Sequence, residues 1–251
     1  MGIGVDLILL AIDDKHGVIR NQRLLAAGLA AVDLVELALA GQVILDGAHV
    51  ALRDAEHDLP QDELLKASLA DLASNQWPTT VADWLQSNRV RTIGRRHLAV
   101  LEQAGVVGPD ASARGSVHSL HIKDHERAVA AVERFRSVAQ VGEPADADVS
   151  AVAFAALADA AGLTDAYLGG RKNKQARERL SELTARRSGD VPEPDRTALA
   201  ILRFAVRAMK ELAQQKGDGG GGGSAGIPVN QQYAIKNATT IAAYDSPIVP
   251  S

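Results

Sequence analysis

Arginine is the residue whose spacing in this sequence most directly indicates a binding chemistry. Arg91 and Arg95 are four residues apart in a segment with a helical pattern, so their side chains share one face. Two guanidinium groups on one face present forked donors that match the oxygens of a phosphate group. The same residues are equally typical of a solvated surface or of pairs with carboxylates. The full candidate anion-binding set is Arg20, Arg23, Arg91, Arg95 and Arg96.

A second basic segment, residues 171–187, begins with RKNKQARERL. Polybasic helices of this kind can lie against anionic lipid or nucleic acid. Glu178 and Glu182 interleave the basic charges, however, and such alternation is typical of a solvated helix face. We therefore interpret this helix as surface rather than as a second binding site.

Histidines gather at His118, His121 and His125, beside Asp124, and invite comparison with a metal site. Metal ligands must converge, whereas alternation along a strand over 117–122 would send the first two histidines to opposite faces. The sequence also lacks cysteine and the phosphate-loop, HExxH and GxSxG motifs. We therefore expect no metal, no cofactor, no catalytic residues and no enzymatic activity.

Composition limits the remaining classes of function. The 251 residues are 46% hydrophobic, which is enough for one full core. A formal net charge of −4 and only 3% aromatic residues disfavour a nucleic-acid-binding protein. The absence of cysteine suits a reducing cytosol, and the sequence shows neither a signal peptide nor an apolar stretch long enough to span a bilayer. We expect a cytoplasmic protein.

Hydrophobic periodicity predicts a mainly α fold, with a single multi-helix domain over residues 1–216 and small β-hairpins. The segment from about 20 to 40 is apolar nearly all round and should be buried by its neighbours. The apolar run at 5–12 is ambiguous between helix and strand. Hairpins are predicted around Asp46-Gly47 and over 106–122. Further helices are expected at about 60–73, from Thr80, and at about 90–103, 124–139, 148–161, 171–187 and 195–215.

The composition changes after Lys216. Residues 217–226, GDGGGGGSAG, are typical of a flexible glycine-rich linker. Residues 227–251 are polar and lack a helical period, which indicates a tail that is disordered or becomes ordered on a partner. The glycine run is also compatible with an engineered linker to a fused peptide.

Three segments together carry a resemblance to a known family. They are LLAIDDKHG (9–17), GLAAVDLVELALAGQVIL (28–45) and LEQAGVV (101–107), and ELALAG at 36–41 is the most specific piece. Their order and spacing resemble those of the Golgi phosphoprotein 3 family over about residues 5–212. We interpret the chain as a bacterial member of this family.

The resemblance implies a soluble helical domain that is peripheral to membranes. Eukaryotic members of the family are adaptors that recognise phosphatidylinositol 4-phosphate through an aromatic side chain and several arginines. They also hold the cytoplasmic tails of glycosyltransferases. By resemblance, this chain should bind a phosphoinositide-like anionic headgroup, and the tails of membrane proteins, at the inner face of a membrane.

The family's headgroup residues carry over only in part. Its tryptophan falls near Asn21 and one arginine falls on Ala30. Of two further arginines, one matches Arg91 and the other falls on Gly94. The family's apolar hairpin tip corresponds to about 109–117, which reads PDASARGSV here. The resemblance thus supports a looser anionic site built from the arginine set above.

A winged-helix DNA-binding protein is the alternative interpretation. The helix at 90–103 followed by the hairpin at 106–122 has the order of a recognition helix and a wing. Arg89, Arg91 and their neighbours would then face phosphates and bases. The acidic net charge and the family resemblance both argue against this alternative.

Overall fold

A computed structural model describes residues 2–53, 60–74, 79–109, 120–140, 148–168, 171–185 and 191–215. Within these residues the chain is mainly helical with short antiparallel strand pairs, which confirms the predicted fold class. The predicted linker and tail at 217–251 lie outside them. The helices are α1 (Ile3–Ala11), α2 (Gln22–Leu39), α3 (Glu63–Ala73), α4 (Val81–Gln86), α5 (Val90–Gln103), α6 (His125–Gln140), α7 (Val149–Ala160), α8 (Thr164–Tyr167), α9 (Arg171–Ala185) and α10 (Asp195–Gln214). The strands are β1 (Ile12–Asp13), β2 (Val18–Ile19), β3 (Val43–Asp46), β4 (His49–Leu52), β5 (Thr79–Thr80), β6 (Val107–Pro109) and β7 (Leu120–Ile122).

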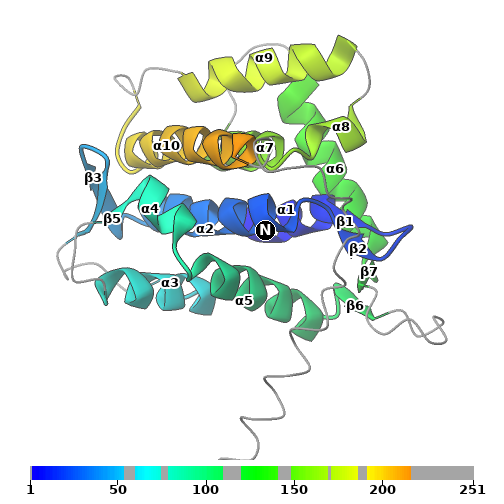
Figure 1. The fold of residues 1–251 in the computed structure, drawn as a ribbon, viewed down its shortest axis with the longest axis horizontal. Helices are drawn as coiled ribbons and strands as arrows, with labels where there is room; N and C mark the ends of the chain where they lie inside the picture. Colours follow the sequence, from blue (N-terminus) through cyan, green and yellow to red (C-terminus); the bar gives the residue numbers. More distant parts are fainter. Residues whose placement is uncertain are drawn as a thin grey trace, which may run out of the picture.

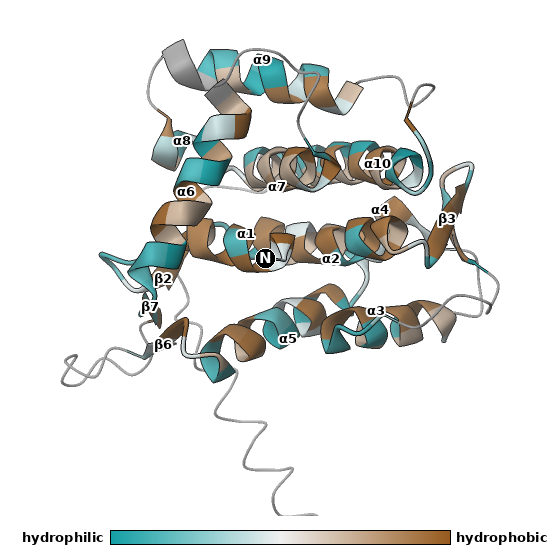
Figure 2. Cartoon of the chain, turned by 180° about the vertical axis from the view of Figure 1, so that it is seen from behind, coloured by the Kyte–Doolittle hydropathy of each residue, from teal (hydrophilic) through white to brown (hydrophobic). Residues whose placement is uncertain are grey.

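The helices are stacked in layers (Figure 1). Helices α1 and α2 lie in the middle, between a layer of α7 and α10 and a layer of α3 and α5. Helix α9 lies beyond α10, and α6 crosses the layers at one end, near β7. Helices α5 and α9 therefore lie at opposite edges of the molecule, and the view from behind shows the same separation (Figure 2).

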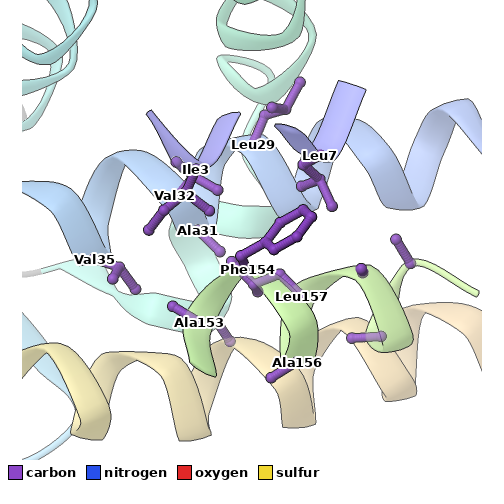
Figure 3. Packing of buried hydrophobic residues seen from close by; sticks show 14 of the residues in the cluster. Ile3, Leu7, Leu29, Ala31, Val32, Val35, Ala153, Phe154, Ala156 and Leu157 are labelled. Carbon is purple, nitrogen blue, oxygen red and sulfur yellow. The ribbon is translucent and has the colours of Figure 1, made fainter. Parts of the chain in front are cut away.

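The interior is built from α1, α2 and α7, whose sequences are apolar on nearly every face. Helices of this composition are stable only when neighbours cover them all round. The ring of Phe154 projects from α7 toward α1 and α2, with Leu7 and Val32 beside it (Figure 3). All three side chains are almost completely buried, and each such burial stabilises the fold by about 1.5–3 kcal/mol. The prediction of a buried helix at 20–40 is confirmed.

A glycine in α2 allows its neighbours to approach closely. A Cβ atom built at Gly28 would lie 3.2 Å from Leu7 Cδ2 of α1 and 3.4 Å from Met209 Cε of α10. The first distance is tighter than most Cβ contacts and the second is at the lower end of the ordinary range, so a larger residue here would require both side chains to shift. The missing side chain thus lets α1 and α10 pack onto the same turn of α2.

One charged pair penetrates this interior. Asp6 of α1 is buried, and its Oδ2 accepts a hydrogen bond of 2.6 Å from Nη1 of Arg134 in α6. The second guanidinium nitrogen donates to Ser150 Oγ of α7, and the guanidinium carbon lies 5.2 Å from the centre of the Phe154 ring. A buried carboxylate needs such a partner, and this pair fixes α6 against α1 and α7.

Local capping signals in the sequence are confirmed. Thr80 Oγ1 accepts from the backbone N–H of Asp83, whose carboxylate accepts from the Thr80 N–H, which is the predicted capping box. Gly41 after α2 and Gly105 after α5 have φ values of 70° and 69°. This left-handed conformation suits glycine and ends both helices where the sequence predicted.

The first predicted hairpin is present, with its turn shifted by one residue. Asp46 of β3 pairs with His49 of β4, so the two loop residues are Gly47 and Ala48 rather than Asp46-Gly47. Gly47 has a φ of 60°, a left-handed conformation that glycine adopts without strain, which explains why glycine occupies this turn position. The second predicted hairpin is the β6–β7 pair, whose connection at 110–119 lies outside the described residues.

Other short elements were not anticipated from the sequence. The ambiguous run at 5–12 is mostly helix α1, because every face of it is covered. Strand β5 pairs with β4 and extends the first hairpin to three strands. Helix α8 has four residues, too few for a hydrophobic period to reveal.

Candidate functional site

Helix α5 divides sharply into a buried and an exposed face. Val90, Ile93 and Leu101 are buried at helical spacing, and His97 lies on the same face. Arg91 and Arg95 are both exposed. The first turn of α5 contains no acidic residue, so the positive end of the helix dipole adds to the arginine charges.

Three of the five predicted arginines are exposed and have no carboxylate partner among the residues that the structure describes. Arg95 donates from Nε to the Arg91 carbonyl at 3.3 Å and from Nη2 to Thr92 Oγ1 at 3.5 Å. Arg23 is exposed in the first turn of α2. Within the described part of the chain, no carboxylate pairs with Arg23, Arg91 or Arg95. We call these three residues the arginine patch.

The three residues of the arginine patch lie near the contact between α2 and α5. A Cβ atom built at Gly94 would lie 3.5 Å from the Cβ of Ala26, and both positions are partly exposed. Arg23 precedes Ala26 by three residues, and Arg91 and Arg95 lie three residues before and one after Gly94. Each arginine is therefore within about one helical turn, or 5.4 Å of rise, of this contact.

The other two predicted arginines are engaged by acids. Arg96 donates from Nη1 to Asp71 Oδ2 at 2.7 Å, which ties α5 to α3. Arg20 pairs with Asp13 Oδ2 at 3.0 Å. The hydrogen bond from His16, together with Arg20, lowers the pKa of Asp13, so this carboxylate stays charged at neutral pH. Arg20 and Arg96 are both half-buried and help to hold the fold around the patch.

A buried polar network that joins α2, α3 and α5 was not predicted from the sequence. Asp33 Oδ1 of α2 lies 2.7 Å from His97 Nε2 of α5, and Asp33 Oδ2 accepts a hydrogen bond from Ser68 of α3. All three side chains are buried. A Cβ atom at Gly4 of α1 would meet the His97 ring at 2.7 Å, so glycine is required there. The only signal in the sequence was the pair of acids, Asp33 and Glu36, inside an otherwise apolar stretch.

The geometry of this network is structural rather than catalytic. Asp33 lies between Ser68 and His97, so the imidazole bonds to the carboxylate rather than to the hydroxyl, and the serine and histidine do not form a nucleophile–base pair. The neighbouring Glu36 accepts a hydrogen bond of 2.9 Å from the N–H of Ile3. Burial raises the pKa of Glu36, and the charge of Asp33 adds to the effect. These contacts fix α1, α2, α3 and α5 relative to one another.

The predicted histidine cluster is only partly visible. His118 lies outside the described residues, and His121 Nδ1 lies 3.4 Å from Asp14 Oδ1. Asp124 accepts from the backbone N–H of Arg127 near the start of α6. Among the described residues, no group of three or more His, Asp or Glu side chains is placed to hold a metal ion. The helices described here also include none with the length and hydrophobicity needed to cross a membrane.

The fold and site together define a helical protein with a buried polar centre and an exposed arginine patch at one edge. Comparison with known families identifies the class. The chain matches the family described as Golgi phosphoprotein 3 (GPP34) over residues 3–214, and it belongs to that family. The predicted resemblance is thus confirmed. No curated protein matches the chain.

Proposed function

We propose that the chain is a peripheral membrane adaptor that binds phosphoinositide-like anionic headgroups through the arginine patch. The observation that carries the proposal is that Arg23, Arg91 and Arg95 are all exposed within about one helical turn of the contact between α2 and α5. Guanidinium groups without a carboxylate partner are available to make charge-assisted hydrogen bonds with phosphate oxygens. Arg20 and Arg96, also predicted for this site, act by holding the surrounding elements.

Membership in the family supports an adaptor over an enzyme and favours lipid over DNA. The proposal accordingly places the protein in the cytoplasm, at the inner face of a membrane, with the cytoplasmic tails of membrane proteins as clients. Attraction to an anionic surface is worth about 1 kcal/mol for each basic residue near it, and salt weakens this attraction. Three arginines should therefore give reversible, salt-sensitive binding.

The test is co-sedimentation with vesicles of phosphatidylcholine alone, or with added phosphatidylinositol or phosphatidylinositol 4-phosphate, at low and physiological salt. The double variant Arg91→Glu/Arg95→Glu should lose about tenfold or more in affinity for the charged vesicles. A matched control, Arg207→Glu/Lys210→Glu, lowers the net charge by the same amount on α10. It should bind the vesicles like the wild type.

Failure to bind any anionic vesicle at low salt would refute the proposal. So would equal losses in the two double variants, since that result would reflect net charge alone. Duplex DNA added in parallel tests the winged-helix alternative. Duplex binding that weakens in Arg95→Glu/Arg96→Glu, without any vesicle binding, would favour that alternative.

A further inference from the structure

A groove of about 480 Å³ lies between the last turn of α9 and the second half of α10. It is open to solvent, and its lining combines cationic side chains with apolar ones. Arg203, Arg207 and Lys210 contribute the positive charge, and Val206 and Ala185 are among the apolar lining residues. Helices α9 and α10, which line the groove, lie on the other side of α1 and α2 from α5 (Figure 1), so the groove is separate from the arginine patch.

We propose that this groove binds an extended acidic peptide segment of a partner protein. The three cations stand at positions i, i+4 and i+7 of one helix, so they form a single row. The helical rise separates the first pair by about 6.0 Å and the second by about 4.5 Å along the axis. In an extended peptide, alternate side chains repeat at about 6.6–6.8 Å on one side. The axial spacings are shorter than this repeat, but the long, flexible side chains of arginine and lysine let acidic residues at alternate positions meet successive cations.

The arrangement favours a peptide over a single phosphate group. The row from Arg203 to Lys210 extends about 10.5 Å along α10, and cations spread over that length do not converge on one small anion. Val206 and Ala185 give the groove an apolar part that a peptide's intervening side chains can cover.

Nucleic acid is a less suitable occupant. The described residues that line the groove include no aromatic side chain on which a base could stack. The formal net charge of −4 also repels a long polyanion. A short acidic segment avoids most of this repulsion because its charge is confined to the groove.

The acidic residue that lines the groove provides an internal control for the peptide-binding test. Glu211 accepts a hydrogen bond of 3.1 Å from Arg207 Nε, so it competes with any acidic ligand for that guanidinium. Neutralising Glu211 should strengthen binding, whereas reversing the cations should abolish it. Opposite effects from adjacent residues on an exposed helix face cannot arise from misfolding.

The probe is a fluorescein-labelled ten-residue peptide that alternates glutamate and threonine, titrated with the full-length protein at low salt and followed by anisotropy. Arg207→Glu/Lys210→Glu should weaken binding about tenfold or more, and Glu211→Gln should tighten it about twofold to fivefold. Arg91→Glu/Arg95→Glu should bind the peptide like the wild type. The same peptide with glutamine in place of glutamate should not bind.

Several results would overturn this inference. They are no binding of the acidic peptide, equal binding of the glutamine peptide, or equal losses in the two double variants. Tighter binding of a single-stranded oligonucleotide that depends on Arg207 and Lys210 would reassign the groove to nucleic acid. Loss of vesicle binding in Arg207→Glu/Lys210→Glu, with Arg91→Glu/Arg95→Glu unaffected, would instead place a membrane contact on α10. Because the arginine patch is tested with vesicles and the groove with peptide, either proposal can fail alone.

Discussion

The two basic edges of this molecule are attached to its interior in different ways. The edge at α5 is fixed by buried polar contacts: Asp33 bonds to His97 and Ser68, and Trp84 Nε1 of α4 donates to the Ala30 carbonyl at 3.2 Å. The edge at α9 is fixed mainly by the buried apolar side chains Leu180 and Leu183. Its polar contacts, such as the hydrogen bond of 3.0 Å from Arg179 Nε to the Val138 carbonyl, are only partly buried. Polar networks specify one geometry, whereas apolar contacts tolerate small shifts.

This difference matches the chemistry proposed for each edge. Headgroup binding requires guanidinium groups from two helices at a fixed separation, and the network beneath α2 and α5 supplies that rigidity. An extended peptide can adjust to a groove, and the row of cations on α10 belongs to a single helix. The spacing of these cations therefore does not depend on how α9 packs, whereas the other wall of the groove, which α9 supplies, does. The comparison predicts that the two edges can be disrupted independently.

The largest effect should come from Asp33→Ala. The substitution removes the acceptor of both His97 and Ser68 and leaves two buried polar groups without their partner. We expect a loss of about 3 kcal/mol in the free energy of unfolding, measured by urea denaturation. Under conditions where the variant is still folded, vesicle binding should fall while binding of the acidic peptide persists.

The matched control on the other edge is Leu183→Ala. It creates a cavity under α9 and should destabilise the protein by about 2–3 kcal/mol. Its effect on binding should be the reverse of that of Asp33→Ala: binding of the acidic peptide should weaken, and binding of the vesicles should not change. If both variants weaken both kinds of binding equally, the two edges are coupled rather than independent.

The fold was largely predictable because its information is local. The bounds of α5 at 90–103 follow from helical spacing and from Gly105, and the start of α4 follows from the Thr80 box. Helix α1 was ambiguous because a run with apolar residues on every face has no period. Only the neighbours that cover it decide between helix and strand.

The candidate site was less predictable because its decisive contacts join distant parts of the chain. Ser68 and His97 are 35 and 64 residues from Asp33 in sequence. The ion pair between Arg96 and Asp71 likewise crosses 25 residues. Residue type alone suggested five equivalent arginines. Only the packing of the helices shows that Arg20 and Arg96 are paired with acids, whereas the other three are exposed.

A smaller effect should follow from Gly94→Arg, which adds a cation at the centre of the arginine patch. A Cβ atom at this partly exposed position would make an ordinary contact of 3.5 Å with Ala26, so the side chain can reach solvent. We expect affinity for phosphatidylinositol 4-phosphate vesicles to rise about threefold. Gly94→Ala is the control, because replacing glycine by alanine also raises the helix propensity, by about 1 kcal/mol, but adds no charge. Equal affinities in the two variants would argue against the patch as the lipid site.

The smallest effect should come from Glu36→Gln and should appear only as a change in how the free energy of unfolding depends on pH. Burial raises the folded-state pKa of Glu36 above its ordinary value of 4.5, so folding favours the protonated form. The free energy of unfolding should therefore decrease as the pH rises from 4.5 through the raised pKa. Glutamine stays neutral and can still accept a hydrogen bond from the Ile3 N–H. The free energy of unfolding of the variant should therefore lack this decrease with pH. Urea midpoints measured from below 4.5 to neutral pH test the expectation, and parallel profiles for wild type and variant would contradict it.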